Sequence, residues 1–227
     1  MDVTYIEHSS FVIDAGTHYL LFDYVQGTLP PLEKKPLYMF VSHHHGDHYS
    51  DRIFHLTHTD EIHYILSDDI SKADVPSQLF IHWVEPYQTL QVDSMQISTL
   101  KSTDEGVAFV IQTEGKTIYY AGDLNNWFWE EEGDSYTKEM SISYHKELDL
   151  LPKHIDLAFV VADQRLGKHY AKGVVELLEK VEVDTLFPMH MGDDTHIYIS
   201  TALAQKLDLF PTKSMLINHT GQTWRNV

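Results

Sequence analysis

The sequence has no cysteine among its 227 residues. This absence excludes disulfide bonds, thiol catalysis and thiolate metal ligands, and it is compatible with the cytoplasm. The side chains that remain able to bind a metal are plentiful: the chain has 16 His and 34 Asp plus Glu.

Positive charge is also scarce. Lys and Arg total 16 against 34 Asp and Glu, so the formal net charge is −18. Proteins that bind nucleic acid gain most of their affinity from basic side chains that neutralise phosphates. The charge balance therefore argues against a general DNA or RNA binder, and against attachment to an anionic membrane surface.

Long apolar runs are missing as well. No run approaches the about 18 residues needed to cross a bilayer, so we expect no transmembrane helix. The opening MDVTYIEHSSFVID has an acidic second residue and no long apolar core, which predicts no signal peptide and a cytoplasmic protein. There is no Gly-x-Ser-x-Gly elbow and no P-loop, so serine hydrolase and nucleoside triphosphatase functions lack support.

The order of predicted elements indicates an α/β protein. Short strands dominate the first half, and strands alternate with helices in the second. We expect a hairpin over 110–120 with its turn at Glu114-Gly115, a helix over 136–151 and a last strand over 214–218. No linker or repeat interrupts the pattern, which predicts a single domain over 1–227 with two packed sheets and helices outside.

The stretch YMFVSHHHGDHYSD, residues 38–51, concentrates metal-binding side chains after an apolar run. On a strand leaving the core, His43 and His45 point to one side and His44 to the other. A polar surface loop is the alternative, but this spacing favours a metal site.

Gly46 allows the backbone to turn directly after these histidines. Asp47 and His48 can then face the same space as His43 and His45. Nitrogen and oxygen donors held so close together suit zinc, iron or manganese.

Two downstream residues supply context. YYAGD puts Asp123 at the end of one strand, and LFPMH puts His190 at the end of another. Each alone is typical of a capping Asp or a surface His. Together with the cluster they indicate a site, because α/β folds build their sites at strand ends.

At this point the sequence resembles the metallo-β-lactamase superfamily. The hallmark His-x-His-x-Asp-His stands at residues 43–48, and Asp23, which closes YLLFD, resembles the family's early Asp that supports the cluster. IEHSSFVID is similar to the ascorbate-phosphate lactonase-like branch. The resemblance implies an αββα fold: a four-layer sandwich of two mixed β-sheets flanked by helices.

The resemblance also implies ligand roles. It assigns His43 and His45 to one metal and Asp123 to a bridging position. It assigns Asp47, His48 and His190 to a second metal. The cofactor implied is one or two divalent ions, most readily Zn²⁺, with Mn²⁺ or Fe as alternatives.

One ligand of the family pattern is missing. The stretch STLKSTDEGVAFVIQTEGKTIYYAGD, residues 98–123, holds no histidine, and the nearest one upstream, His82, falls within a predicted strand. The expected neighbourhood holds Ser102, Thr103 and Asp104. Either Asp104 replaces the imidazole with an oxygen donor, or the first metal position is weak or empty.

The chemistry implied is hydrolysis of an ester, lactone or phosphodiester bond in a small substrate by a metal-activated water. Asp47 would orient or deprotonate that water. The alternatives are a nuclease acting on nucleic acid and a non-catalytic metal-binding or sensing protein. The missing histidine supports the sensor, and the net charge opposes the nuclease.

Three further residues are candidates for the surroundings of the site. His8 is a substrate or ligand-supporting candidate. Arg165, predicted to pair with Asp163, is the natural anchor for an anionic group in so acidic a protein. Trp127 either packs in the core or forms a wall of the substrate pocket.

Overall fold

The computed structural model describes residues 1–57, 61–192 and 196–227. Over these residues the chain forms two seven-stranded sheets, with orders β14-β1-β2-β3-β4-β5-β6 and β13-β12-β11-β10-β9-β8-β7. The strands of the first sheet are β1 (Asp2–Glu7), β2 (Ser10–Asp14), β3 (Tyr19–Phe22), β4 (Leu37–Val41), β5 (Ile62–Ser67), β6 (Ile81–Val84) and β14 (Thr223–Trp224).

The second sheet and the helices follow in the chain. Its strands are β7 (Thr89–Val92), β8 (Met95–Lys101), β9 (Val107–Thr113), β10 (Lys116–Tyr120), β11 (His154–Val161), β12 (Glu182–Met189) and β13 (Lys213–Ser214). The α-helices are α1 (Gly133–Leu148), α2 (Lys172–Leu178) and α3 (His196–Lys206). Short 3₁₀ helices are η1 (Asp51–His55), η2 (Lys72–Asp74), η3 (Glu130–Glu132) and η4 (Gln164–His169), which is kinked at Gly167.

Both sheets are mixed, as expected. In the first sheet β1, β2 and β3 pair antiparallel, whereas β3 to β6 pair parallel. The second sheet repeats this plan, with antiparallel pairing from β7 to β10 and parallel pairing from β10 to β13. The α/β sandwich of two mixed sheets is therefore confirmed.

Aromatic side chains join the two sheets across the core. The ring of Phe22 on β3 stacks on Phe40 of its own sheet at 5.0 Å between centroids and on Tyr120 of the other sheet at 4.5 Å. Phe40 contacts Phe109 of the second sheet edge-on at 5.2 Å. These four rings are buried, and such pairs stabilise a core beyond the area they remove from water.

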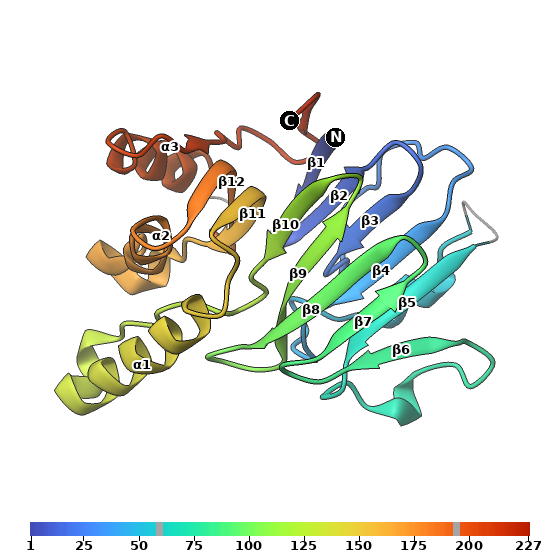
Figure 1. The fold of residues 1–227 in the computed structure, drawn as a ribbon, viewed down its shortest axis with the longest axis horizontal. Helices are drawn as coiled ribbons and strands as arrows, with labels where there is room; N and C mark the ends of the chain where they lie inside the picture. The colour runs from blue at the N-terminus through green and yellow to red at the C-terminus, as the bar shows by residue number, and fades with distance from the viewer. Residues whose placement is uncertain (58–60, 193–195) are drawn as a thin grey trace.

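The outer faces of the sheets are covered differently. The helices α1, α2 and α3 gather on the side of β11 and β12 (Figure 1). A separate apolar cluster on the first sheet includes Leu21, Met39 and Leu66, and it packs against Ile53 of η1. All residues of β4 are buried, as its continuous apolar run predicts for a strand covered on both faces.

The residue ranges of three predicted elements can be compared with those in the structure. The hairpin over 110–120 is confirmed, with positive φ at Glu114 (50°) and Gly115 (73°). The helix expected over 136–151 runs from Gly133 to Leu148. The strand expected over 214–218 was wrong in extent, because only Lys213–Ser214 pairs with β12.

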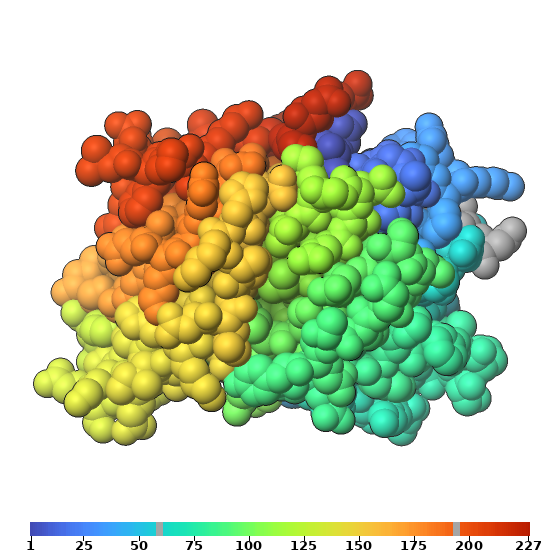
Figure 2. Space-filling model, in the orientation of Figure 1, coloured from blue at the N-terminus to red at the C-terminus, as the bar shows by residue number. Residues whose placement is uncertain are grey.

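The two chain ends lie side by side. Strand β14 pairs antiparallel with β1, and the Met1 amino group lies 3.2 Å from the Val227 carbonyl oxygen. Figure 2 shows the red C-terminal residues against the dark blue N-terminal ones. Within the described ranges, no helix combines the length and the apolar character needed to span a bilayer.

Candidate metal centre

The predicted site residues come together where parallel strands of both sheets end. Asp23 follows β3 and the segment 42–48 follows β4, which is its parallel neighbour. Asp123 and His190 follow β10 and β12 in the parallel part of the second sheet. Parallel strands present their carboxyl ends at one edge. The two edges meet, since His43 Nε2 lies 3.7 Å from Asp123 Oδ2.

Two glycines permit this close approach. A Cβ on Gly106 (φ +67°) would lie 2.1 Å from the Ser42 carbonyl oxygen and 2.6 Å from the His43 Cβ. A Cβ on Gly122 (φ +51°) would lie 2.7 Å from the Ser42 Cβ. Both backbones are left-handed, a conformation that glycine adopts without steric cost. The edges can therefore meet only where no side chain intervenes.

A first group of donor atoms surrounds His45. Its Nδ1 lies 3.0 Å from His43 Nε2 and 3.9 Å from Asp104 Oδ2. One donor atom each from His45, Asp104 and Asp123 lie within 4.8 Å of one another. The structure thus brings Asp104 into the region where the sequence lacks the expected histidine.

A second group surrounds Asp47. Its Oδ2 lies 3.4 Å from His8 Nε2, 3.5 Å from His190 Nε2 and 4.0 Å from His48 Nε2. Asp123 faces this group with Oδ1, which is 3.2 Å from His48 Nε2 and 3.6 Å from His190 Nε2. Since Oδ2 of Asp123 faces the first group, its carboxylate stands between the two.

Several converging atoms have no hydrogen-bond partner although they are buried. They are His8 Nε2, His48 Nε2, Asp123 Oδ1 and His190 Nε2. Buried polar atoms in folded proteins are almost always satisfied, because an unpaired one costs free energy. A cation between imidazole nitrogens and carboxylate oxygens would satisfy all of these atoms at once, so the residues present fit a divalent metal.

Carboxylates behind the cluster orient the two buried imidazoles. Asp23 Oδ2 lies 2.7 Å from His48 Nδ1, and Asp163 Oδ2 lies 2.9 Å from His190 Nδ1. A carboxylate at Nδ1 favours the tautomer that leaves the Nε2 lone pair free for a metal. The sequence indicated a supporting role for Asp23. It did not indicate one for Asp163, whose position after β11 was the available signal.

Asp23 is itself held rigidly. It is buried and accepts hydrogen bonds from the Ser42 backbone N–H at 2.8 Å, the Ser42 hydroxyl at 2.7 Å and the Tyr120 hydroxyl at 2.7 Å. The tyrosine belongs to the other sheet. Asp23 therefore ties the end of β4 to β10 as well as orienting His48.

Burial and opposite charges compete at the cluster. Burial lowers the pKa of His43 to about 4. Burial also disfavours charge on His190, yet Asp163 and Asp47 raise the pKa of that imidazole to about 9. Burial opposes ionisation of Asp123, but the His48 charge holds the pKa of the carboxyl well below its usual range. A metal that binds here must therefore displace protons.

A cavity of about 390 Å³ opens beside the second group. Its lining is mostly polar: His8, Val25, Gln26, Gly46, Asp47, Asp163, Gln164, Arg165, His190 and Gly192. The predicted ion pair is confirmed, since Arg165 Nε donates to Asp163 Oδ2 at 2.8 Å. The Arg165 side chain is 60% exposed and so remains able to meet a ligand.

Trp127 lies behind the donors and does not line this cavity. Its side chain is buried, and its Nε1 donates to the Asp123 carbonyl oxygen at 2.9 Å. Its ring centroid lies 5.7 Å from that of His190. Of the two interpretations of Trp127, packing fits the structure and a pocket wall does not.

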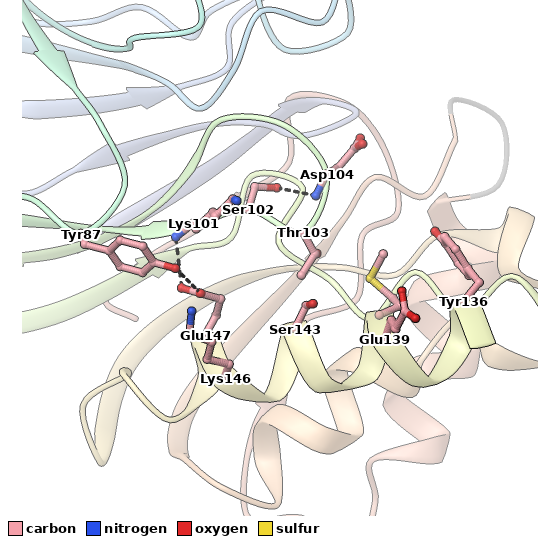
Figure 3. Close-up of a pocket in the computed structure, with 11 residues that line it drawn as sticks. Tyr87, Lys101, Ser102, Thr103, Asp104, Tyr136, Glu139, Ser143, Lys146 and Glu147 are labelled. Carbon is pink, nitrogen blue, oxygen red and sulfur yellow. Dashed lines mark hydrogen bonds between the residues drawn. The ribbon is translucent and has the colours of Figure 1, made fainter. Parts of the chain in front are cut away.

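A second cavity of about 390 Å³ lies between segment 101–104 and α1 (Figure 3). The Glu147 carboxylate in its lining is already hydrogen-bonded by neighbouring lining residues: it accepts from the Tyr87 hydroxyl at 2.6 Å and from the Lys101 N–H at 3.1 Å. Asp104 borders this cavity, but its carboxylate points away from Glu147 (Figure 3). The cavity beside Asp47 is therefore the better candidate for a substrate site.

Comparison with known proteins agrees with this geometry. A UPF0173 metal-dependent hydrolase of Methanocorpusculum labreanum is 25% identical over 206 residues, covering 85% of this chain and 84% of its own. A second, from Methanosarcina barkeri, is 26% identical over 209 residues, covering 83% and 82%.

Solved structures show the same fold at lower identity. Igni18, a metallo hydrolase of Ignicoccus hospitalis, aligns with a TM-score of 0.66 at 17% identity over 98% of this chain and 97% of its own. An isothiocyanate hydrolase from Delia radicum gut bacteria aligns with a TM-score of 0.55 at 16% identity over 99% and 98%.

A match to a protein-family model shows which family the chain belongs to. The model described as "Beta-lactamase superfamily domain" matches residues 2–138, more than half of the chain, and this range includes Asp23, residues 43–48 and Asp123. The chain therefore belongs to the metallo-β-lactamase superfamily.

Proposed function

We propose that this protein is a metal-dependent hydrolase that cleaves an ester, lactone or phosphodiester bond in a small polar substrate. The observation that carries the proposal is the set of buried, unpartnered nitrogen and oxygen atoms that converge beside the cavity at Asp47. Such atoms persist in a folded protein when a ligand satisfies them. The relatives named metal-dependent hydrolases support the same function.

The residues that would hold the metal are those of the two donor groups. His43, His45 and Asp104 would hold one ion, with Asp123 between the positions. The other position would be held by Asp47, His48 and His190. A divalent ion lowers the pKa of a water it binds to about 7, which supplies a nucleophile near neutral pH. The donor set favours Zn²⁺, with Mn²⁺ or Fe as alternatives.

Asp47 is the proposed general base. Its side chain is 50% exposed and lines the cavity. The neighbouring His190 and His8 hold the pKa of Asp47 well below its usual range, so the carboxylate is ionised. A base must lie within hydrogen-bond reach of the proton it takes, and Asp47 borders both the donors and the space a substrate would fill.

Arg165 is the proposed substrate anchor. Its guanidinium borders the cavity while Asp163 holds it in place. A planar guanidinium binds carboxylate or phosphate groups with two hydrogen bonds. The substrate is thus a small molecule with an anionic group, in keeping with the likeness of IEHSSFVID to the ascorbate-phosphate lactonase-like branch.

The other candidate functions have less support. A nuclease needs cationic surface along its substrate, and the formal net charge here is −18. A sensor without catalysis would not need a cavity of about 390 Å³ beside the donor atoms. We propose a cytoplasmic location on the absence of cysteine.

The direct test measures metal and activity together. Purified protein is analysed for bound metal and then assayed on ester, lactone and phosphodiester panels with Zn²⁺, Mn²⁺ or Fe²⁺ added. Asp123→Ala should lose metal and hydrolysis together, whereas Asp68→Ala at an exposed position should lose neither. Unchanged metal content in Asp123→Ala would refute the proposal.

A further inference from the structure

We propose that His8 is a metal ligand, at the position that Asp47, His48 and His190 would also hold. The inference rests on the proposed metal-dependent function, and it adds a donor outside the His-x-His-x-Asp-His stretch. His8 lies in the turn between β1 and β2, far in sequence from these residues.

The distances around Asp47 carry the first step. From its Oδ2, the Nε2 atoms of His8, His190 and His48 lie 3.4, 3.5 and 4.0 Å away. The four donor atoms of this group lie within 4.8 Å of one another. Tetrahedral ligands at ordinary zinc bond lengths are about 3.4 Å apart. His8 is therefore spaced from the others as a ligand would be.

The state of the His8 nitrogen carries the second step. Its Nε2 is buried and makes no hydrogen bond, although a carboxylate oxygen lies nearby. The ring packs on His190 with centroids 4.3 Å apart and approaches His48 edge-on at 5.9 Å. An imidazole directed among other imidazoles with an unpaired nitrogen indicates a shared cation.

The backbone carries the third step. His8 has φ +50°, a left-handed conformation that costs a residue with a side chain free energy unless the surroundings impose it. Its carbonyl oxygen accepts a hydrogen bond from the His190 N–H at 3.3 Å, and His190 is itself left-handed at φ +60°. The two turns are thus joined, and a histidine stands where glycine would fit more easily.

The consequence is an asymmetric pair of positions. With His8, the position at Asp47 has three imidazoles and one carboxylate before Asp123 is counted, a complete donor set for zinc. The position at His43 and His45 relies on the carboxylate of Asp104, a harder donor. We expect the His8 position to bind zinc more tightly than the other.

The test uses Co²⁺ as a spectroscopic probe and Zn²⁺ in competition with a chromophoric chelator. His8→Asn is the main variant, because asparagine tolerates a left-handed backbone but is too short to replace Nε2. It should weaken the tighter site by at least about tenfold, the loss seen even for residues that only support a ligand. The visible absorption of bound Co²⁺ should also change, since its coordination changes.

The matched control is His44→Ala. His44 belongs to the same histidine run, but its Nδ1 lies 3.0 Å from Asp69 Oδ2, away from the donors. The His44→Ala variant should bind Co²⁺ and Zn²⁺ as the wild type does. His8→Gly guards against misfolding: it relieves the backbone strain, so its metal-free form should melt no lower than the wild type while its metal affinity falls.

The outcomes separate this inference from the proposed function. If the wild type binds metal and the Co²⁺ spectrum is the same in His8→Asn and His8→Gly, His8 is not a ligand and only this inference is overturned, whether or not the affinity has changed. If the wild type binds no metal, both proposals fall.

Discussion

Asp163 Oδ2 contacts two functional side chains at once. It lies 2.9 Å from His190 Nδ1 and accepts a hydrogen bond from Arg165 Nε at 2.8 Å. One buried oxygen therefore orients a proposed metal ligand and holds the proposed substrate anchor.

Removing the charge of Asp163 should weaken metal binding. In Asp163→Asn the His190 imidazole loses the carboxylate that fixes its tautomer, and such losses typically cost 10- to 100-fold in metal affinity, roughly. A competition titration with a zinc chelator measures the change. Asp184→Asn is the control, because Asp184 pairs with His154 at 3.1 Å on the surface. Equal losses in both variants would contradict the role given to Asp163.

Asp104 should decide whether the first metal position fills. Asp104→Ala should lose metal from the position at His43 and His45 and retain it at the other, because Asp104 is not among the donors around Asp47, His48 and His190. Anomalous scattering from crystals grown with Zn²⁺ distinguishes the two peaks. Glu105→Ala, at the exposed neighbouring position, should keep both. Asp104→His should shift the first position from Mn²⁺ towards Zn²⁺, since imidazole suits zinc.

The contiguous part of the site was predictable because local geometry sets it. Residues 43–48 form one short loop after a buried strand, so alternation and one turn suffice to converge His43, His45, Asp47 and His48. Asp123 and His190 were predictable as strand-end residues, but their distances to the loop depend on how two sheets pack.

The parts that escaped prediction depend on pairing between distant segments. Asp163 reaches His190 because β11 and β12 pair in register, with Val161 opposite Met189. Strand β14 covers only Thr223–Trp224, too short for an apolar pattern to be visible. The turn at His8 reaches the cluster only after β1 has joined the sheet.

Arg165 should govern binding of anionic substrates. Arg165→Met keeps apolar contact with Trp127 and Trp129 but removes the charge that lies near both rings. We expect KM for an anionic ester to rise by about tenfold or more, the loss of one charge-assisted hydrogen bond, with metal content unchanged. KM for a neutral ester of similar size should stay within about twofold. A parallel rise for both esters would argue against an anion anchor.

Asp23 should matter for stability as well as for the site. Asp23→Asn removes a buried charge that accepts from Ser42 and Tyr120 and faces His48. Breaking such a buried network costs about 3 kcal/mol, measurable by urea unfolding of the metal-free protein. Asp14→Asn, which breaks the more exposed pair with Lys35, should cost about 1 kcal/mol or less. Similar values for the two would mean that the Asp23 network adds nothing.

His18 should make stability depend on pH away from the metal centre. Burial lowers the pKa of His18 below 6.5, and the side chain lies against Thr113, with Nε2 3.2 Å from its hydroxyl. In the unfolded chain the imidazole takes up a proton as the pH falls through about 6.5. In the folded protein His18 is protonated only at a lower pH. Between these two pKa values the unfolded state binds more protons than the folded state. The contribution of His18 to the free energy of unfolding is therefore complete above about pH 6.5 and declines as the pH falls towards the folded-state pKa.

His18→Gln keeps a hydrogen-bonding group at this position and removes the titration. The free energy of unfolding of the metal-free wild type, measured in urea from about pH 7.5 to about pH 5, should therefore fall more steeply than that of the variant. The difference between the two free energies of unfolding cancels the contributions of the carboxylates and histidines that both proteins share. Parallel curves for wild type and His18→Gln would show that His18 is protonated equally in both states.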